Sequence, residues 1–111
     1  MKITLLQTDI KWCSPAENIA TAEKLILDAE KSDIYILPEM FSTGFCMEPE
    51  KIAESVGGDA FTFMMLMAKR MDAAIVGSVA VCDNGSYYNR MYFCKPDGTF
   101  ESYDKHHLFT F

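Results

Sequence analysis

Two short and almost wholly apolar stretches place the strongest limit on the fold. Residues 34–37 read Ile-Tyr-Ile-Leu, and residues 74–81 read Ala-Ile-Val-Gly-Ser-Val-Ala-Val. Strands that are apolar along their whole length, without alternation, are typical of sheets that are covered on both faces. We therefore expect both stretches to be buried strands in a layered fold.

Helical patterns precede both of these strands. Ser14 is a candidate N-cap, Pro15 suits the first helical position, and Glu17 completes a capping box. Apolar residues then recur at helical spacing, which predicts a helix to about Lys31. A second helix is predicted after residues 57–59 (Gly-Gly-Asp), where methionines at helical spacing are typical of core packing rather than of a ligand site.

The remaining strands are marked by turn signals. Residues 3–8 read as a first strand, and the Asn-Gly pair at 84–85 predicts a hairpin after residues 74–81. Residues 87–95 and 99–104 read as further strands separated by a Pro-Asp-Gly turn. Residues 38–50 read as a loop. The order strand-helix-strand-helix-strand followed by hairpins predicts an α/β fold with a mixed β-sheet and two main helices.

Charge and hydropathy exclude several classes of function. The chain of 111 residues has 10 basic and 16 acidic residues, a net charge of −6, and no basic stripe. Nucleic-acid binding requires clustered Lys and Arg, so we expect no nucleic-acid partner. No apolar run approaches the roughly 20 residues of a membrane span, and the N-terminus lacks the pattern of a signal peptide. We expect a cytoplasmic protein without a membrane partner.

The four cysteines, Cys13, Cys46, Cys82 and Cys94, lie far apart in the sequence and form no Cys-x-x-Cys pair. Without a secretory signal, a disulfide framework is not expected, and the spacing of a zinc site is absent. We expect all four to be free and mostly buried thiols. No cofactor or metal is expected.

Glu39 is the strongest candidate for a catalytic residue. It lies just after the predicted strand 34–37, and the carboxyl ends of strands are where α/β sheets place their sites. Partial burial there would raise its pKa toward the range of a general base. The alternative is an ordinary surface glutamate.

Lys105 follows the last predicted strand and precedes His106 and His107. A lysine held near a carboxylate stays charged and can donate to a developing oxyanion. Adjacent histidines in a strand point to opposite faces, so we do not expect them to bind a metal together. Cys46 follows Glu39 in the same loop, but a neighbouring carboxylate alone raises a thiol's pKa, so we rank it low as a nucleophile.

Two long strings carry a family resemblance: Pro-Glu-Met-Phe-Ser-Thr-Gly-Phe at 38–45 and Tyr-Asp-Lys-His-His-Leu-Phe at 103–109. Together with the Tyr-Asn-Arg at 88–90 and the Pro-Asp-Gly turn, they resemble the carbon-nitrogen hydrolase (nitrilase) superfamily, most closely its omega-amidase branch. The resemblance runs through essentially the whole chain in register. It implies the N-terminal part of an αββα sandwich that dimerises into four layers, so a homodimer or higher homo-oligomer is expected.

The resemblance also implies a mechanism. Glu39 would be the general base and Lys105 the oxyanion donor, and a cysteine thiolate would attack the amide carbonyl. Water would then hydrolyse the thioester, with a small 2-oxo dicarboxylic acid monoamide as the substrate. The family's cysteine follows a further strand beyond the lysine, and none of the four cysteines takes that place. Residues 1–111 are therefore expected to be the N-terminal portion of one hydrolase domain, with the nucleophile beyond this chain.

Two alternatives to an omega-amidase-like enzyme remain open. In the first, the chain is a catalytically incomplete fragment that serves as a structural or interaction module. In the second, it is part of an enzyme with another activity of the superfamily, such as nitrile or N-carbamoyl hydrolysis. No basic residue can be chosen as an anchor for an anionic 2-oxo acid, since Arg90 is expected to serve the hairpin.

Overall fold

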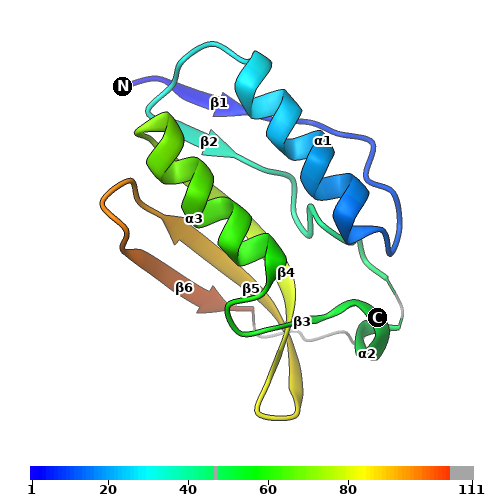
Figure 1. Cartoon of the computed structure of the whole chain (residues 1–111). Coiled ribbons are helices and arrows are strands. Elements are labelled where there is room, and N and C mark those ends of the chain that lie inside the picture. The colour runs from blue at the N-terminus through cyan, green and yellow to red at the C-terminus, as the bar shows by residue number, and fades with distance from the viewer. Residues whose placement is uncertain (47, 106–111) are drawn as a thin grey trace.

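The computed structural model describes residues 1–46 and 48–105. Within them, helices and strands alternate first and a run of strands follows (Figure 1). In chain order the elements are β1 (Ile3–Leu5), α1 (Pro15–Asp28), β2 (Ile34–Ile36), α2 (Pro49–Ile52), β3 (Glu54–Ser55), α3 (Asp59–Met71), β4 (Ala74–Asp83), β5 (Ser86–Cys94) and β6 (Phe100–Asp104).

These strands form one mixed sheet in the order β1-β2-β4-β5-β6. The strands β1, β2 and β4 are parallel, β4, β5 and β6 are antiparallel, and the short β3 pairs with the far end of β4. The expected α/β fold with a mixed sheet is confirmed. The helices α1 and α3 lie side by side on one face of this sheet (Figure 1).

The hydrophobic core lies between the two helices and the sheet. Ile75 and Val79 of β4 belong to it, together with Met64 of α3, and all three are buried. Gly77 allows close packing here, because a Cβ at this position would lie 3.3 Å from Leu37 Cβ and 3.4 Å from Met64 Cε. The predicted role of the α3 methionines as core residues is confirmed for Met64.

The opposite face of the sheet carries the alternate residues of the same strands. Ser78 of β4 pairs with Met91 of β5, which in turn pairs with Tyr103 of β6. Met91 and Tyr103 are 39% and 55% exposed. This face is thus partly apolar and open in the described chain, and the candidate site lies on it.

The helix α1 begins at Pro15 as predicted, but its capping differs from the prediction. The Ser14 hydroxyl donates to the Trp12 carbonyl and makes no capping bond, and Glu17 forms an ion pair with Lys11. The helix ends at Asp28 instead of near Lys31.

The early end of α1 has a structural cause in the segment that leads to β2. The buried Tyr35 hydroxyl accepts the backbone N–H of Ser32 and donates to the carbonyl of Glu30. These backbone groups are therefore used by a side chain that follows closely in sequence instead of by the helix. Such a contact overrides local helical periodicity and cannot be read from it.

The segment predicted as a loop up to Glu50 contains more structure than expected. It includes the start of α2, and β3 follows. Both are too short to give a periodic signal. The Glu54 carboxylate accepts the backbone N–H groups of Ala60 and Phe61 and so satisfies the first turn of α3. Burial raises the pKa of Glu54.

None of the helices in the described residues is long and apolar enough to cross a membrane.

Neighbouring residues of α1 offer a matched test of this core. Ile26 is fully buried, whereas Leu27 is 42% exposed. We expect Ile26→Ala to lower the free energy of unfolding by about 2–5 kcal/mol, because it leaves a cavity between α1 and the sheet. Leu27→Ala should cost less than about 1 kcal/mol. Urea denaturation of both variants measures the difference, and equal losses would contradict the packing of α1 described here.

Candidate functional site

Glu39 lies just past the carboxyl end of β2, as the sequence predicted. The last backbone bond between β2 and β4 runs from Leu37 N to Val76 O, at 2.8 Å, and the chain then turns away. The Ser78 hydroxyl of β4 accepts the Met40 N–H at 2.8 Å. These two bonds to β4 fix the backbone on both sides of Glu39.

The residue after Glu39 has an unusual backbone conformation. Met40 has a φ of 53° and is fully buried. Its carbonyl accepts the N–H groups of Thr43 and Gly44, which closes a tight turn. A left-handed conformation costs a residue other than glycine about 1–3 kcal/mol and is concentrated at functional sites. Glu39 therefore lies directly before a strained turn, which these hydrogen bonds to the Met40 carbonyl close.

Lys105 directly follows β6, in the antiparallel half of the sheet, and its side chain lies on the same face as Glu39. Its backbone N–H donates to the Asn89 carbonyl at 3.0 Å, which extends the β5–β6 ladder by one bond. Its ammonium group forms an ion pair with Glu39 Oε2. The structure thus brings together the two residues that the sequence singled out, with side chains 39% and 40% exposed. The partial burial expected for Glu39 is therefore modest.

Asn89 completes this cluster and was not predicted as a site residue. Its side-chain Nδ2 donates to Glu39 Oε2 at 3.3 Å, and the residue is 7% exposed. Its Oδ1 is buried and accepts no hydrogen bond from any residue that the structure describes. A buried acceptor without a partner costs about 1–3 kcal/mol. The available signal was its place in the Tyr-Asn-Arg string at 88–90, which carries part of the family resemblance.

A cavity of about 260 Å³ opens beside the ion pair. Its size suits a small molecule, and its walls are mostly apolar with a few polar groups, as in many ligand sites. Lys105 supplies the positive charge of the lining and Glu39 the negative charge. The lining residues are Ile36, Leu37, Glu39, Val76, Gly77, Ser78, Met91 and Lys105.

Arg90 is engaged in the sheet and is not free to anchor a substrate. Its guanidinium contacts Asp104 Oδ1 at 2.6 Å and Asp83 Oδ2 at 3.0 Å, and so ties β6 and β4 to β5. The hydrogen bonds with Asp104 raise the pKa of Arg90 above its usual value. The predicted role of Arg90 in the hairpin is confirmed.

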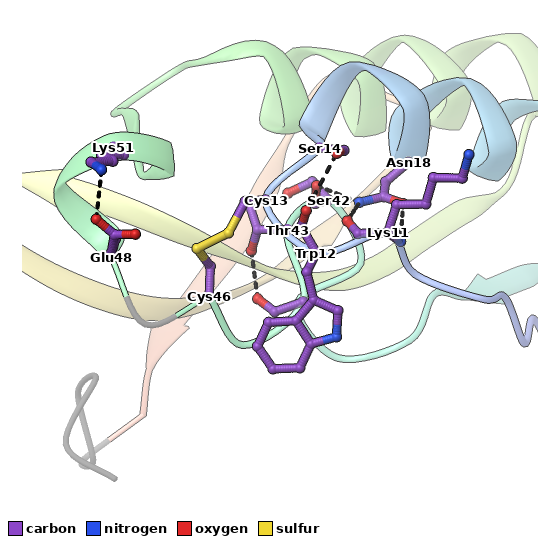
Figure 2. The surroundings of a disulfide bond; sticks show 11 residues. Lys11, Trp12, Cys13, Ser14, Asn18, Ser42, Thr43, Cys46, Glu48 and Lys51 are labelled. Atoms are coloured by element: carbon purple, nitrogen blue, oxygen red, sulfur yellow. Dashed lines mark hydrogen bonds and ion pairs between the residues drawn. A yellow bond between two sulfur atoms is a disulfide. The ribbon is translucent and has the colours of Figure 1, made fainter.

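The prediction that all four cysteines are free is wrong for two of them. Cys13 and Cys46 form a disulfide, with their Cα atoms 5.7 Å apart (Figure 2). Their separation of 33 residues in sequence gave no sign that the fold brings them together. Cys46 is therefore excluded as a nucleophile while this bond is intact. Cys82 and Cys94 are free, neither lines the cavity, and burial raises the pKa of Cys94 to about 12.

The disulfide belongs to a set of contacts that attach the loop after Glu39 to the start of α1 (Figure 2). Cys13 N–H donates to the Thr43 carbonyl at 2.8 Å. The buried Asn18 side chain donates to the Ser42 carbonyl at 2.9 Å and also bonds both backbone groups of Lys11. The loop that carries Glu39 is thus fixed at both ends, by β4 and by the segment before α1.

His106 and His107 lie outside the described residues. Within residues 1–46 and 48–105, no group of three or more His, Cys, Asp or Glu residues is placed to hold a metal ion.

The fold and the site together define an α/β protein with a Glu-Lys pair beside a small cavity. Residues 2–110 match the family model described as carbon-nitrogen hydrolase, and the chain belongs to this family. It is 36% identical to the omega-amidase YafV of Yersinia enterocolitica and 37% identical to a 2-oxoglutaramate amidase of Bacillus subtilis. These matches include 98% and 96% of this chain but 42% and 43% of the relatives, so the chain spans about two-fifths of their length.

A solved structure agrees with this assignment over nearly the whole chain. It is XC1258 of Xanthomonas campestris, a CN-hydrolase superfamily protein described with an arsenic adduct in its active site. The TM-score is 0.90 at 36% sequence identity, over 96% of this chain and 41% of that one. The predicted resemblance to the superfamily and the predicted fold class are both confirmed.

The disulfide can be tested by peptide mapping. Trypsin without reduction should release the peptides 12–24 and 32–51 joined through Cys13 and Cys46, and reduction should separate them. Reduction also opens the loop that the Cys13–Cys46 bond closes, with a sequence separation of 33. This is expected to lower the free energy of unfolding by about 4 kcal/mol at most. Cys82→Ser is the control that leaves the linked peptides unchanged. Two separate peptides without reduction would contradict the bond.

Proposed function

We propose that this chain is part of an omega-amidase-like enzyme that hydrolyses the terminal amide of a small 2-oxo dicarboxylic acid monoamide. One observation carries the proposal: Glu39 and Lys105, far apart in sequence, form an ion pair beside a cavity of about 260 Å³. A base and a fixed positive charge are the groups that amide hydrolysis by a thiol requires. The relatives named omega-amidase and 2-oxoglutaramate amidase support the choice of substrate class.

The proposal includes a division of the catalytic groups along the chain. Residues 1–111 form the N-terminal portion of one hydrolase domain and supply the general base and the oxyanion donor. The nucleophilic cysteine lies beyond Phe111. This agrees with the observation that Cys82 and Cys94 do not line the cavity, and that Cys13 and Cys46 are bonded to each other.

In this mechanism, Glu39 takes the proton of the cysteine thiol, and the thiolate attacks the amide carbonyl carbon. Lys105 donates to the oxygen of the tetrahedral intermediate as its negative charge develops. The C–N bond breaks, the proton passes from Glu39 to the leaving nitrogen, and ammonia departs. Glu39 then takes a proton from water, and the resulting hydroxide attacks the thioester carbonyl. The C–S bond breaks, the carboxylic acid is released, and Glu39 returns the proton to the cysteine thiolate.

A second function is favoured by the same cysteine geometry. A chain that holds the base and the oxyanion donor without a thiol in the cavity also suits an inactive structural or interaction module. Such a module would form a stable oligomer and release no ammonia from amides. Turnover that alkylation of a thiol abolishes would exclude it.

Substrate profiling separates the proposed reaction from the other activities of the family. The protein as its source cell produces it should release ammonia from 2-oxoglutaramate faster than from nitriles, and it should not hydrolyse N-carbamoyl amino acids at a comparable rate. A preference for a nitrile or an N-carbamoyl compound would overturn the choice of substrate but not the Glu-Lys chemistry.

Paired substitutions test the two residues. Glu39→Gln should lower kcat about 10²–10⁴-fold through loss of the general base. Lys105→Met should lower it about 10²–10³-fold through loss of the oxyanion donor. The ion pair of Lys95 with Glu101, at 2.9 Å on the surface, provides matched controls. Glu101→Gln and Lys95→Met should leave kcat unchanged, and full activity of Glu39→Gln would contradict the proposal.

Homo-oligomerisation and a cytoplasmic location stay predictions of the resemblance and the composition. Light scattering during size-exclusion chromatography of the source-cell protein measures the first, and cell fractionation measures the second.

A further inference from the structure

Asn89 is an unusual residue to find at its position. It lies on β5 opposite the buried Ala80 of β4 and is itself 7% exposed. Its Oδ1 is buried and unpaired within the described part of the chain. An apolar residue of similar shape would avoid this loss of a hydrogen bond. Buried polar groups that lower stability in this way are expected at functional positions.

The orientation of the Asn89 amide follows from its neighbour. Nδ2 lies 3.3 Å from Glu39 Oε2 and donates to it. A flipped amide would place Oδ1 against the carboxylate, so that two acceptors would face each other. The amide therefore keeps its donor on Glu39, and the unpaired Oδ1 is the consequence.

The same residue also fixes Lys105. The Asn89 carbonyl accepts the Lys105 backbone N–H at 3.0 Å, directly after β6 ends at Asp104. Both charged groups of the proposed reaction are thus held by one residue of β5, one through a side chain and the other through the main chain.

The contacts of Glu39 also distinguish its two oxygens. The Lys105 ammonium and the Asn89 amide both bind Oε2. Within the described residues, Oε1 is left to accept a proton. A carboxylate held by one oxygen presents the other in a fixed direction, which is what efficient proton transfer requires.

We propose that Asn89 is a positioning residue for this site: its amide holds Glu39 by Oε2 so that Oε1 faces the thiol, and its carbonyl sets the place of Lys105. This inference rests on the proposed function and extends it from two residues to three. Asn89 does not take up a proton or touch the substrate. It acts through Glu39 and Lys105.

Two substitutions at Asn89 separate positioning from a role in stability. Asn89→Leu keeps a similar shape and the backbone carbonyl, and it removes both the donor and the unpaired oxygen. We expect it to fold with a melting temperature at or above that of the unsubstituted protein. Its kcat should fall about 10–100-fold at nearly constant KM, because Glu39 loses its orientation.

Asn89→Asp provides an independent readout through pH. Near neutral pH the new carboxylate would face Glu39, with Lys105 as the nearby cation, and kcat should fall at least as far as in Asn89→Leu. Protonation of Asp at this position restores an O–H donor to Glu39. The kcat of Asn89→Asp relative to the unsubstituted protein should therefore rise as the pH falls, which a purely structural role would not produce.

The control is Asn84→Asp, the same chemical change in the exposed turn of the same hairpin. It should change neither kcat nor its pH dependence. The measurement is ammonia release from 2-oxoglutaramate by the source-cell protein and its variants. A folded Asn89→Leu variant with full kcat, in a protein that Glu39→Gln inactivates, would overturn this inference alone. No ammonia release by the unsubstituted protein would overturn the proposed function and this inference with it.

Discussion

The pairing of β4 with its neighbours is the constraint on which the rest of the structure depends. This strand is parallel to β2 and β3 and antiparallel to β5, and its residues face the helices on one side and the candidate site on the other. Ile75 and Val79 are buried in the core, whereas the Ser78 hydroxyl accepts the backbone N–H of Met40, next to Glu39. Alternate residues of this one strand therefore contribute to the core on one face and to the candidate site on the other.

The parallel and antiparallel halves of the sheet make different contributions to the site. In the parallel half, β2 ends at Ile36, and Glu39 follows just before the turn in which Met40 has a left-handed backbone conformation. The antiparallel half carries the chain through two hairpins and returns Lys105 to the same place. An ion pair between two partly exposed groups adds little stability by itself. The proposed function therefore gives this pair a catalytic role rather than a structural one.

Much of this arrangement could be predicted from local patterns. The apolar strands β2 and β4, the helices before them and the Asn-Gly hairpin are encoded in adjacent residues, and the position of Glu39 and Lys105 after strands follows from them. The expected burial holds for most of β4, whereas in β2 only Tyr35 is fully buried. What could not be predicted depends on tertiary contacts. The bond between Cys13 and Cys46 and the amide of Asn89 against Glu39 each join segments far apart in sequence, whose approach has no local signal. The Tyr35 hydroxyl binds nearby backbone groups after α1, and helical periodicity does not show this contact.

The central claim is that Glu39 and Lys105 serve a thiol nucleophile that this chain does not contain. Intact mass spectrometry of the source-cell protein, before and after rapid mixing with 2-oxoglutaramate, tests it most directly. The account predicts a mass well above the 12.5 kDa of this chain and a transient increase by one acyl group that alkylation of a thiol prevents. A mass of 12.5 kDa with no acyl adduct would contradict it.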